Sequence, residues 1–440
     1  MFTAALLPLL RNPTYSFVLA AAVIGAAIAW RSTVIPLALA GVPPLIDAIV
    51  GYNPLPKGGF TFVFSLWIAV SLACVAMRGR LGDIPRALLS VGVLASFALL
   101  GLMLMRLSIS PDETYGSQKV QLFIADVLIL FVAAVFVGAA ESGPRRFFSV
   151  LFALNALGAI VFLLNLVSGG AHLTFNGRFS LASQEYPIDL GRASADGLLL
   201  ALYFVISATQ RNVRLLGIVL APVLAVALAA AGSRGPVVAF AIGLLALLTL
   251  TAVNPRARRR LGIVAFVFLL AAVIVPLVVP GSALGRALST IIGSASGLSS
   301  NGRSQLWSVS IATFSQHPLL GLGTGGFGSL VTGILYPHNI LLEVATELGI
   351  VGAIVLLTVL GAFIRATVGT WRLSAGSDRL VASMLIALFL TALVNAFFSE
   401  AIQGNAEVWL WGGMAIGMHT RLTQPATRPQ RPRPQATAVL

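Results

Sequence analysis

KVQLFIADVLILFVAAVFVGAAE, at residues 119–141, is almost entirely apolar. A helix that crosses a bilayer needs about 20 such residues in succession. Similar runs recur along the whole chain, without the short alternating strands of an outer-membrane barrel. The sequence therefore predicts an all-α polytopic membrane protein.

The composition supports this prediction. The 440 residues are 58% hydrophobic and 10% charged, whereas soluble domains carry about 25% charged residues. The net charge of +14 suggests nucleic-acid binding, but the arginines lie in short loops between apolar runs and fit membrane orientation better. Only Lys57 and Lys119 are lysines, and the single cysteine, Cys74, excludes an intramolecular disulfide and a cysteine-rich metal site. No cleavable signal peptide is expected, because the first apolar segments lack a convincing cleavage site.

The length that a bilayer requires selects thirteen candidate spans. They are roughly 14–30, 33–50, 60–78, 87–106, 119–141, 147–168, 190–209, 213–232, 235–252, 261–280, 340–364, 380–399 and 405–420. Arg31, Pro36 and the pair Pro43-Pro44 interrupt the first two. If 14–50 is one broken helix or a re-entrant pair, about twelve spans remain and both chain ends are cytoplasmic. Thirteen spans would put the N-terminus outside, and we favour twelve.

Every second loop is basic, which predicts the orientation. The arginines of these loops are Arg78, Arg80, Arg86, Arg145, Arg146, Arg211, Arg214, Arg256, Arg258, Arg259, Arg260, Arg365, Arg372, Arg379 and Arg421. Basic loops stay in the cytoplasm, so the loops at about 169–189 and 281–338 face outward. We expect residues 1–421 to form one transmembrane domain and the proline-rich, basic residues 422–440 to be a disordered cytoplasmic tail.

Arginines on the outer side need a separate explanation. Arg234, in ALAAAGSRGPVVAF, is the only charged residue between Arg214 and Arg256. An arginine near hydrocarbon should face a polar cavity or an anion, although it could also anchor the turn at the head groups. Arg192 precedes Asp196 by four residues, so a binding site and a simple intrahelical ion pair are equally good explanations for it.

The long outer loop carries further candidates. SSNGRSQLWSVSIATFSQHPLLGLGTGGFGSL, at residues 299–330, predicts a helix that begins at Asn301 or Gly302 and ends before Pro318. Trp307, Ile311 and Phe314 would share its apolar face. Arg303 lies in its first turn, and Arg286 precedes it in the loop. GLGTGGFG is similar to a phosphate-binding loop, but no lysine follows it and it does not join a strand to a helix.

LYPHNILLEVATELG, at residues 335–349, opens the eleventh candidate span. Pro337 suits a first helical turn, which places His338 among free backbone N–H groups that keep an imidazole neutral. Asn339, Glu343 and Glu347 are spaced by four and form one stripe, about 100° from His338. We expect the glutamates to pair with outer arginines. An interfacial histidine with two ordinary ion pairs is the alternative.

Several common catalytic motifs are missing from the sequence. It contains no D-x-D, H-E-x-x-H, P-loop or G-x-S-x-G. We therefore predict no metal and no cofactor.

Three motifs in order resemble the O-antigen ligase and polymerase superfamily. They are SRG at 233–235, GRSQLW…HPLLGLGTGGF at 302–327 and HNILLEVATELGIVG at 338–352, and the similarity covers about residues 175–365. The resemblance implies a GT-C-type glycosyltransferase of the bacterial inner membrane, with about twelve spans and a long periplasmic loop that contains short helices. The single long outer loop and the absence of a soluble extension favour a ligase.

The resemblance also implies a site that faces the periplasm. His338 would be its catalytic residue, and Tyr336, Asn339, Glu343 and Glu347 would support it. Arg192, Arg234 and Arg303, with Arg286 as a weaker fourth, would bind the donor pyrophosphate, since arginine forks match phosphate. The expected partners are an undecaprenyl-pyrophosphate-linked glycan donor, a lipid A–core acceptor and membrane lipids, with no nucleic acid.

Other functions remain open at this point. A polymerase or a protein O-oligosaccharyltransferase of the same superfamily would share the donor and differ in the acceptor. A secondary transporter or flippase, with Asp47 and Asp126 as binding residues, is a more distant alternative, and the sequence shows no inverted repeat in its favour.

Overall fold

The computed structural model describes residues 32–41, 59–77, 84–168, 172–173, 179–180, 187–251 and 303–424. Nearly all of this part is helical. Its one sheet is the antiparallel pair of β1 (His172–Leu173) and β2 (Phe179–Ser180), in which His172 lies opposite Ser180. The helices are α3 (Val34–Ala40), α5 (Gly59–Met77), α6 (Ile84–Leu88), α7 (Val91–Met105), α8 (Glu113–Leu122), η1 (Phe123–Leu128), α9 (Ile129–Ala139), α10 (Gly143–Val167), α11 (Pro187–Ser207), α12 (Arg211–Ala230), α13 (Arg234–Thr251), α17 (Arg303–Gln316), η2 (Gly326–Ser329), α18 (Ile340–Leu373), α19 (Gly376–Phe398), η3 (Ile402–Asn405) and α20 (Ala406–Leu422).

Seven helices of the described residues are long and apolar enough to cross a membrane. They are Glu113–Ala139, which joins α8, η1 and α9, then α10, α11, α12, α13, α18 and α19. The chain is therefore a multi-pass membrane protein, as predicted. The candidate spans 14–30 and 261–280, residues 42–50 of the candidate span 33–50, the residues around Arg286 and the tail after residue 424 lie outside the described residues. The total of about twelve spans stays a prediction.

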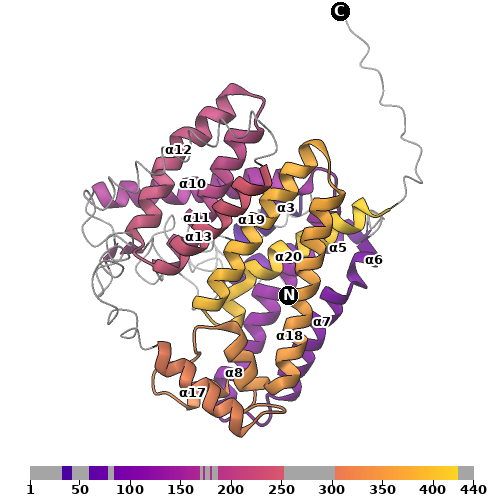
Figure 1. Ribbon diagram of the computed structural model, residues 1–440, viewed down its shortest axis with the longest axis vertical. Helices are drawn as coiled ribbons and strands as arrows, with labels where there is room; N and C mark the ends of the chain where they lie inside the picture. The colour runs from indigo at the N-terminus through magenta and orange to yellow at the C-terminus, as the bar shows by residue number, and fades with distance from the viewer. Residues whose placement is uncertain are drawn as a thin grey trace, which may run out of the picture.

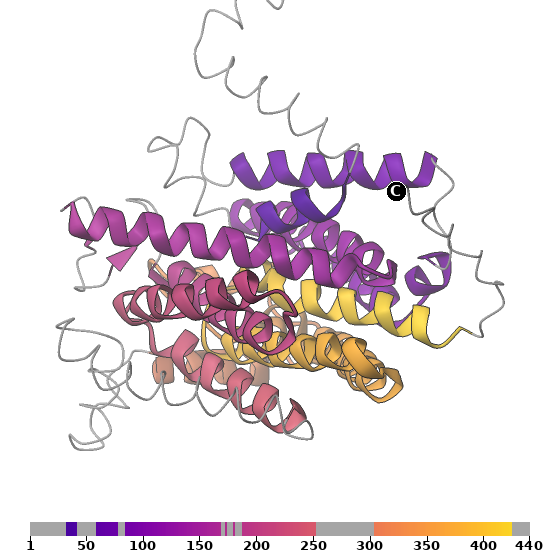
Figure 2. The ribbon, with the colours of Figure 1, turned by 90° about the horizontal axis from the view of Figure 1, so that it is seen from above.

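The helices pack into one bundle, with α5 and α13 on opposite sides of it (Figures 1 and 2). Glycines let α9 and α20 approach closely at its centre. A Cβ added to Gly138 would lie 2.1 Å from the Met414 oxygen, and one added to Gly417 would lie 2.1 Å from the Val135 oxygen. Small residues are the usual means of close helix packing in membranes, where no water drives apolar faces together.

The helix α18 is interrupted near its beginning. Gly349 has φ +66° and ψ −160°, a backbone conformation outside the helical region, so a short segment to Leu348 precedes the longer one. The loop before it satisfies the broken hydrogen bonds: Leu322 N–H donates to Thr346 O at 2.9 Å, and Ile350 N–H donates to Pro318 O at 2.8 Å. The predicted span 340–364 is thus two segments, and it continues to Leu373.

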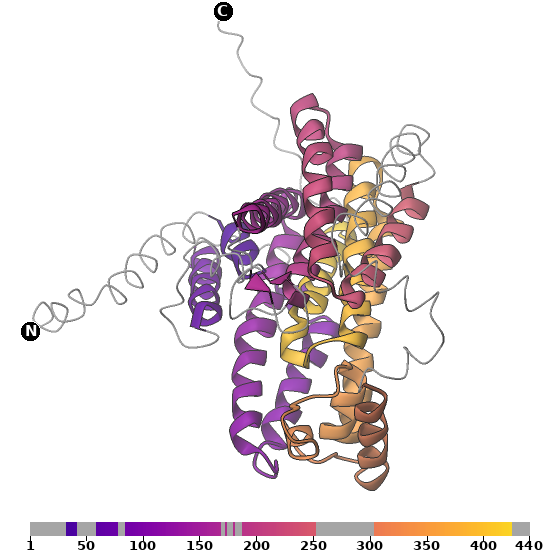
Figure 3. The ribbon, with the colours of Figure 1, turned by 90° about the vertical axis from the view of Figure 1, so that its left-hand side faces the viewer.

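The predicted helix of the outer loop is present as α17 (Figure 3). The prediction of its apolar face was wrong. Leu306, Ser310 and Thr313 are buried, whereas Ile311 is 58% exposed. The helix packs on the start of α18, where Thr346 Oγ1 donates to Ser310 O at 3.4 Å, so small polar side chains fit that contact better than the larger Ile311.

Candidate functional site

Two residues with unusual backbone lie together at the end of the bundle that carries α17. His338 (φ 58°) and Glu400 (φ 62°) are the non-glycine residues with positive φ in the described part of the chain. That conformation is uncommon for residues with a side chain, and such strain concentrates at binding and catalytic sites. Tyr336 connects the two: its hydroxyl donates to Glu400 Oε2 at 3.2 Å, and its ring centroid lies 4.7 Å from that of His338.

Contacts on both sides fix the backbone of His338. The Trp307 indole donates to Pro337 O at 3.2 Å. On the other side, Asn339 Oδ1 accepts from Leu341 N–H and Leu342 N–H, both at 3.0 Å, while Asn339 Nδ2 donates to Phe397 O at 3.1 Å. Asn339 is therefore the N-cap of α18, a position that asparagine favours because its short side chain satisfies free N–H groups.

This cap corrects two predictions. Pro337 and His338 precede the helix instead of forming its first turn, because Asn339 is the N-cap and Ile340 the first helical residue. Helical periodicity does not apply to His338, because this residue lies outside the helix. The predicted separation of 100° between His338 and the glutamate stripe was therefore wrong. His338 Nδ1 is buried and has no hydrogen-bond partner among the described residues, which leaves it available to a ligand.

His338 shares a pocket with Arg303. The pocket has a volume of about 580 Å³, and α17 together with Val331 and Ile334 completes its lining. Burial lowers the pKa of His338, the Arg303 charge lowers it further, and the Glu400 carboxylate opposes both effects. The balance favours a neutral imidazole at neutral pH, the form that accepts a proton. Burial and the nearby carboxylate of Glu400 raise the pKa of Tyr336, so this phenol stays protonated.

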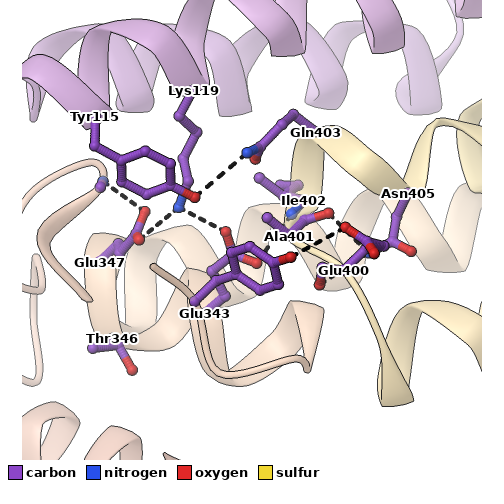
Figure 4. Close-up of polar contacts among 12 residues, drawn as sticks. Tyr115, Lys119, Glu343, Thr346, Glu347, Glu400, Ala401, Ile402, Gln403 and Asn405 are labelled. Carbon is purple, nitrogen blue, oxygen red and sulfur yellow. Dashed lines mark hydrogen bonds and ion pairs between the residues drawn. The ribbon is translucent and has the colours of Figure 1, made fainter. Parts of the chain in front are cut away.

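The glutamates of α18 pair with a lysine from α8 (Figure 4). Lys119 Nζ lies 2.6 Å from Glu343 Oε1 and 2.6 Å from Glu347 Oε1. The expected pairing with outer arginines was therefore wrong, because Lys119 comes from a distant helix that the outer-loop motifs do not include. All three side chains are buried, with Lys119 0% exposed.

The Lys119–Glu343–Glu347 cluster also holds two loops in place. Glu343 Oε2 accepts from Ile402 N–H at 3.0 Å, which fixes the turn that carries Glu400. Glu347 Oε2 accepts from Gly325 N–H at 2.8 Å, which fixes the glycine-rich loop GLGTGGFG. In the structure this loop packs against α8, where a Cβ on Gly116 would lie 2.3 Å from Thr324 O.

Arg192 is buried within the same end of the bundle. Its guanidinium donates to Ser399 Oγ at 2.8 Å, Asn405 Oδ1 at 2.9 Å and Gly404 O at 3.0 Å. It forms no ion pair with Asp196, so the simple intrahelical pair is not what the structure shows. The Nη atoms of Arg192 hold the turn at 399–405, and its buried Nε has no hydrogen-bond partner among the described residues.

Arg234 begins α13 and is half-buried. Its side chain has no hydrogen bond or ion pair to the residues that the structure describes. Nearby, neither amide atom of the buried Asn395 has a hydrogen-bond partner among the described residues, and a Cβ on Gly235 would lie 3.9 Å from Asn395 Oδ1. Since Gly191 packs on Pro236, the structure brings the starts of α11 and α13, and with them Arg192 and Arg234, to one place.

Two residues of this site were not predicted from the sequence. Lys119 is one of only two lysines in the chain, and a lysine inside an apolar run was a signal that could have found it. Glu400 gave no comparable signal, because its position depends on the turn between α19 and α20. Arg286 lies outside the described residues. Within the described ranges no group of three or more His, Cys, Asp or Glu side chains could hold a metal ion.

The fold and this site define a class: a multi-pass membrane protein with a histidine, arginines and carboxylates gathered at one end of its bundle. The family model described as O-antigen ligase matches residues 219–357, which include Arg234, Arg303, His338 and the glutamates of α18. This match covers 139 of the 440 residues and supports membership of the chain in the O-antigen ligase superfamily. No curated protein matches the chain.

Proposed function

We propose that this protein is an O-antigen ligase. It would transfer a glycan from undecaprenyl pyrophosphate to a sugar hydroxyl of lipid A–core at the periplasmic face of the bacterial inner membrane. The observation that carries the proposal is the pocket shared by His338 and Arg303 within the region of family similarity. It combines a group that accepts a proton with a group that binds phosphate, which are the two needs of this reaction.

His338 acts as the general base in this proposal. The neutral imidazole takes the proton of the acceptor hydroxyl as the oxygen attacks the anomeric carbon of the donor. The bond from that carbon to the pyrophosphate oxygen breaks, and undecaprenyl pyrophosphate leaves with the electron pair. A single displacement of this kind inverts the anomeric centre. The imidazolium then releases its proton to water, and the donor needs no ATP because its pyrophosphate is already a good leaving group.

Arginines stabilise the departing pyrophosphate. Arg303 lies in the pocket of His338, and Arg234 has donors that no described residue occupies. Guanidinium groups match phosphate oxygens with paired hydrogen bonds, and they act most strongly where water is excluded. Because Arg192 already donates to the turn at 399–405, we propose that its main role is to hold that turn.

A deletion strain separates the ligase from its nearest alternatives. Loss of a ligase leaves lipid A–core without O-antigen while polymer accumulates on the lipid carrier. Loss of a polymerase instead leaves lipopolysaccharide with a single repeat, and loss of a protein O-oligosaccharyltransferase leaves lipopolysaccharide unchanged.

Purified protein in liposomes tests the chemistry directly. With both lipid substrates, EDTA and no ion gradient, we expect the O-antigen to appear on lipid A–core. A folded preparation that forms no product, or one that requires a gradient, would contradict the enzyme and favour a transporter. Inhibition by EDTA would contradict the metal-independent mechanism alone.

A further inference from the structure

A second pocket lies at the opposite end of the bundle from His338. It has a volume of about 1160 Å³ and lies among α10, α11, α12, α19 and the last turn of α13. The site residues lie near the first residues of α11 and α13 and the last residues of α19, whereas this pocket lies at the other ends of the same helices. The 23 residues of α19 correspond to roughly 34 Å, so the two sites are separate.

The lining of this pocket is cationic. Arg145, Arg214 and Arg379 contribute to it, and no aspartate, glutamate, lysine or histidine is among its lining residues in the described part of the chain. Hydroxyl groups, including those of Ser207 and Thr209, lie between the arginines. Such a lining provides hydrogen-bond donors and positive charge, which suits a phosphate group.

Three helices also begin at this end. α10, α12 and α19 start with Gly143, Arg211 and Gly376, and their N-termini add partial positive charge. The first turns of α10 and α12 contain no acidic residue. Asp378, in the first turn of α19, accepts a hydrogen bond from Arg145 and lies 3.7 Å from Arg421, so its charge is already compensated.

The arginines of the pocket keep free donors. The Arg214 side chain forms no hydrogen bond or ion pair with the residues that the structure describes. Arg379 stacks on the Trp371 ring, with its central carbon 3.6 Å from the ring centroid, and it donates once, to Ser374 O at 3.3 Å. Stacking fixes the plane of a guanidinium and leaves its remaining N–H groups available for a ligand.

The lining of the pocket is also partly apolar. Phe204, Leu250 and Leu380 line it beside the arginines. On α12, Ile218 lies one turn after Arg214 and therefore on the same face of the helix, and it is 45% exposed. A free phosphate would use only the cationic part, whereas a phospholipid would use both parts.

We infer that this pocket binds the phosphate of an anionic phospholipid head group, with the acyl chains of the lipid along the exposed face of α12. Basic pockets between membrane helices are the usual form of such sites. This lipid pocket uses neither His338 nor a glycan, so the test of lipid binding does not depend on the proposed glycan transfer.

Native mass spectrometry of the full-length protein, released from detergent, tests the inference. We expect phosphatidylglycerol to bind at least about tenfold more tightly than phosphatidylcholine, because only the former carries net charge. Arg214→Gln with Arg379→Gln should weaken binding of phosphatidylglycerol roughly 30-fold, at about 1 kcal/mol for each arginine removed. The matched control is Arg211→Gln with Arg372→Gln, two exposed arginines that do not line the pocket, and it should bind as the parent does.

Three outcomes would overturn the inference. The first is that the parent protein binds the two lipids equally well. The second is that the pocket variant and the control variant lose the same amount of affinity for phosphatidylglycerol. The third is that millimolar inorganic phosphate or glycerol 3-phosphate displaces the lipid completely, which would show a site for small anions. If the double variant does not fold, Arg214→Gln alone decides the question, because that side chain has no partner to lose among the described residues. It should weaken binding about fivefold, and unchanged binding would refute the site.

Discussion

At the scale of single residues, the properties of His338 depend on two charged neighbours with opposite effects. Arg303 lowers the pKa of the imidazole and Glu400 raises it, while burial lowers it more than either changes it. Glu400 is tied to the histidine through Tyr336, whose ring packs on the imidazole. Substitutions at Arg303 or Glu400 can therefore raise or lower the pKa of His338 without a change to the histidine itself.

The pH dependence of transfer follows from these neighbours. A general base must be neutral, so the rate should be constant above the lowered pKa of His338 and should fall as the pH drops through it, below about 6.5. Arg303→Gln should move this fall to higher pH, and Glu400→Gln should move it to lower pH. The measurement is kcat/KM against pH in liposomes. Shifts of both variants in the same direction would refute this electrostatic account.

Arg234 should be as important for transfer as His338. We expect His338→Ala and Arg234→Ala each to reduce kcat by about 100-fold or more, through loss of the base and of pyrophosphate stabilisation respectively. Arg234→Lys should recover only part of the rate, because lysine lacks the fork of donors. The exposed Arg211→Ala serves as the control. Normal activity of Arg234→Ala would remove Arg234 from the site.

At the scale of elements, the cluster of Lys119, Glu343 and Glu347 joins α8 and α18 to two loops. One lysine faces two carboxylates in a place where none of the three is accessible to water. A buried charge left without its partner costs about 3–5 kcal/mol. The cluster is thus a condition for the site, because it holds the turn of Glu400.

Replacing Lys119 alone should destabilise the protein more than replacing all three charged residues of the cluster. We expect Lys119→Met to destabilise the protein by about 3–5 kcal/mol, because two buried carboxylates lose their cation. The combination of Lys119→Met, Glu343→Gln and Glu347→Gln should regain part of that loss. Thermal unfolding of the purified proteins in detergent measures both. A Tm of Lys119→Met equal to that of the parent would contradict the argument.

The break in α18 should tolerate only glycine. In Gly349→Ala the new Cβ would lie 2.3 Å from the Leu319 carbonyl at a φ of +66°, so we expect a loss of about 2–5 kcal/mol. Gly361 is the control on the same helix. It has ordinary helical φ and nothing within 4 Å of its added Cβ, so Gly361→Ala should stabilise the protein by about 0.5–1 kcal/mol. Equal Tm changes would show that the break needs no glycine.

The elements also show what a sequence can predict. Apolar length located α10 to α13 within a few residues, and the N-terminal signal with Pro318 located α17, because these features act locally. The break at Gly349 was missed because it depends on a distant loop that supplies hydrogen bonds, and the partners of Glu343 and Glu347 were missed because Lys119 lies on another helix.

At the scale of the whole molecule, the connections between the helices place His338 at one end and the arginine-lined pocket at the other. This arrangement agrees with the alternation of basic loops, which predicts that the end with Arg145, Arg214 and Arg379 is cytoplasmic. The order of the motifs was visible in the sequence, but their convergence in space required the packed bundle.

Labelling from one side of the membrane tests this orientation. Cys74 is the only cysteine and is buried, so Cys74→Ser provides a background free of thiols. We expect an impermeant maleimide to label Ser315→Cys, on α17, in cells with a permeabilised outer membrane. Thr423→Cys, after α20, should be labelled only after the inner membrane is opened. The reverse pattern would place His338 in the cytoplasm and refute a periplasmic reaction.

The Lys119–Glu343–Glu347 cluster has a consequence for attempts to exchange parts between members of the superfamily. Residues 219–357 contain His338 and both glutamates, but Lys119, Arg192 and the turn of Glu400 lie outside them. A chimera that gives only this segment to a host protein would bury two carboxylates whose cation the segment does not contain. To keep the Lys119–Glu343–Glu347 cluster intact, the exchange would have to include α8 and the connection between α19 and α20, so the smallest exchangeable module is discontinuous in the gene.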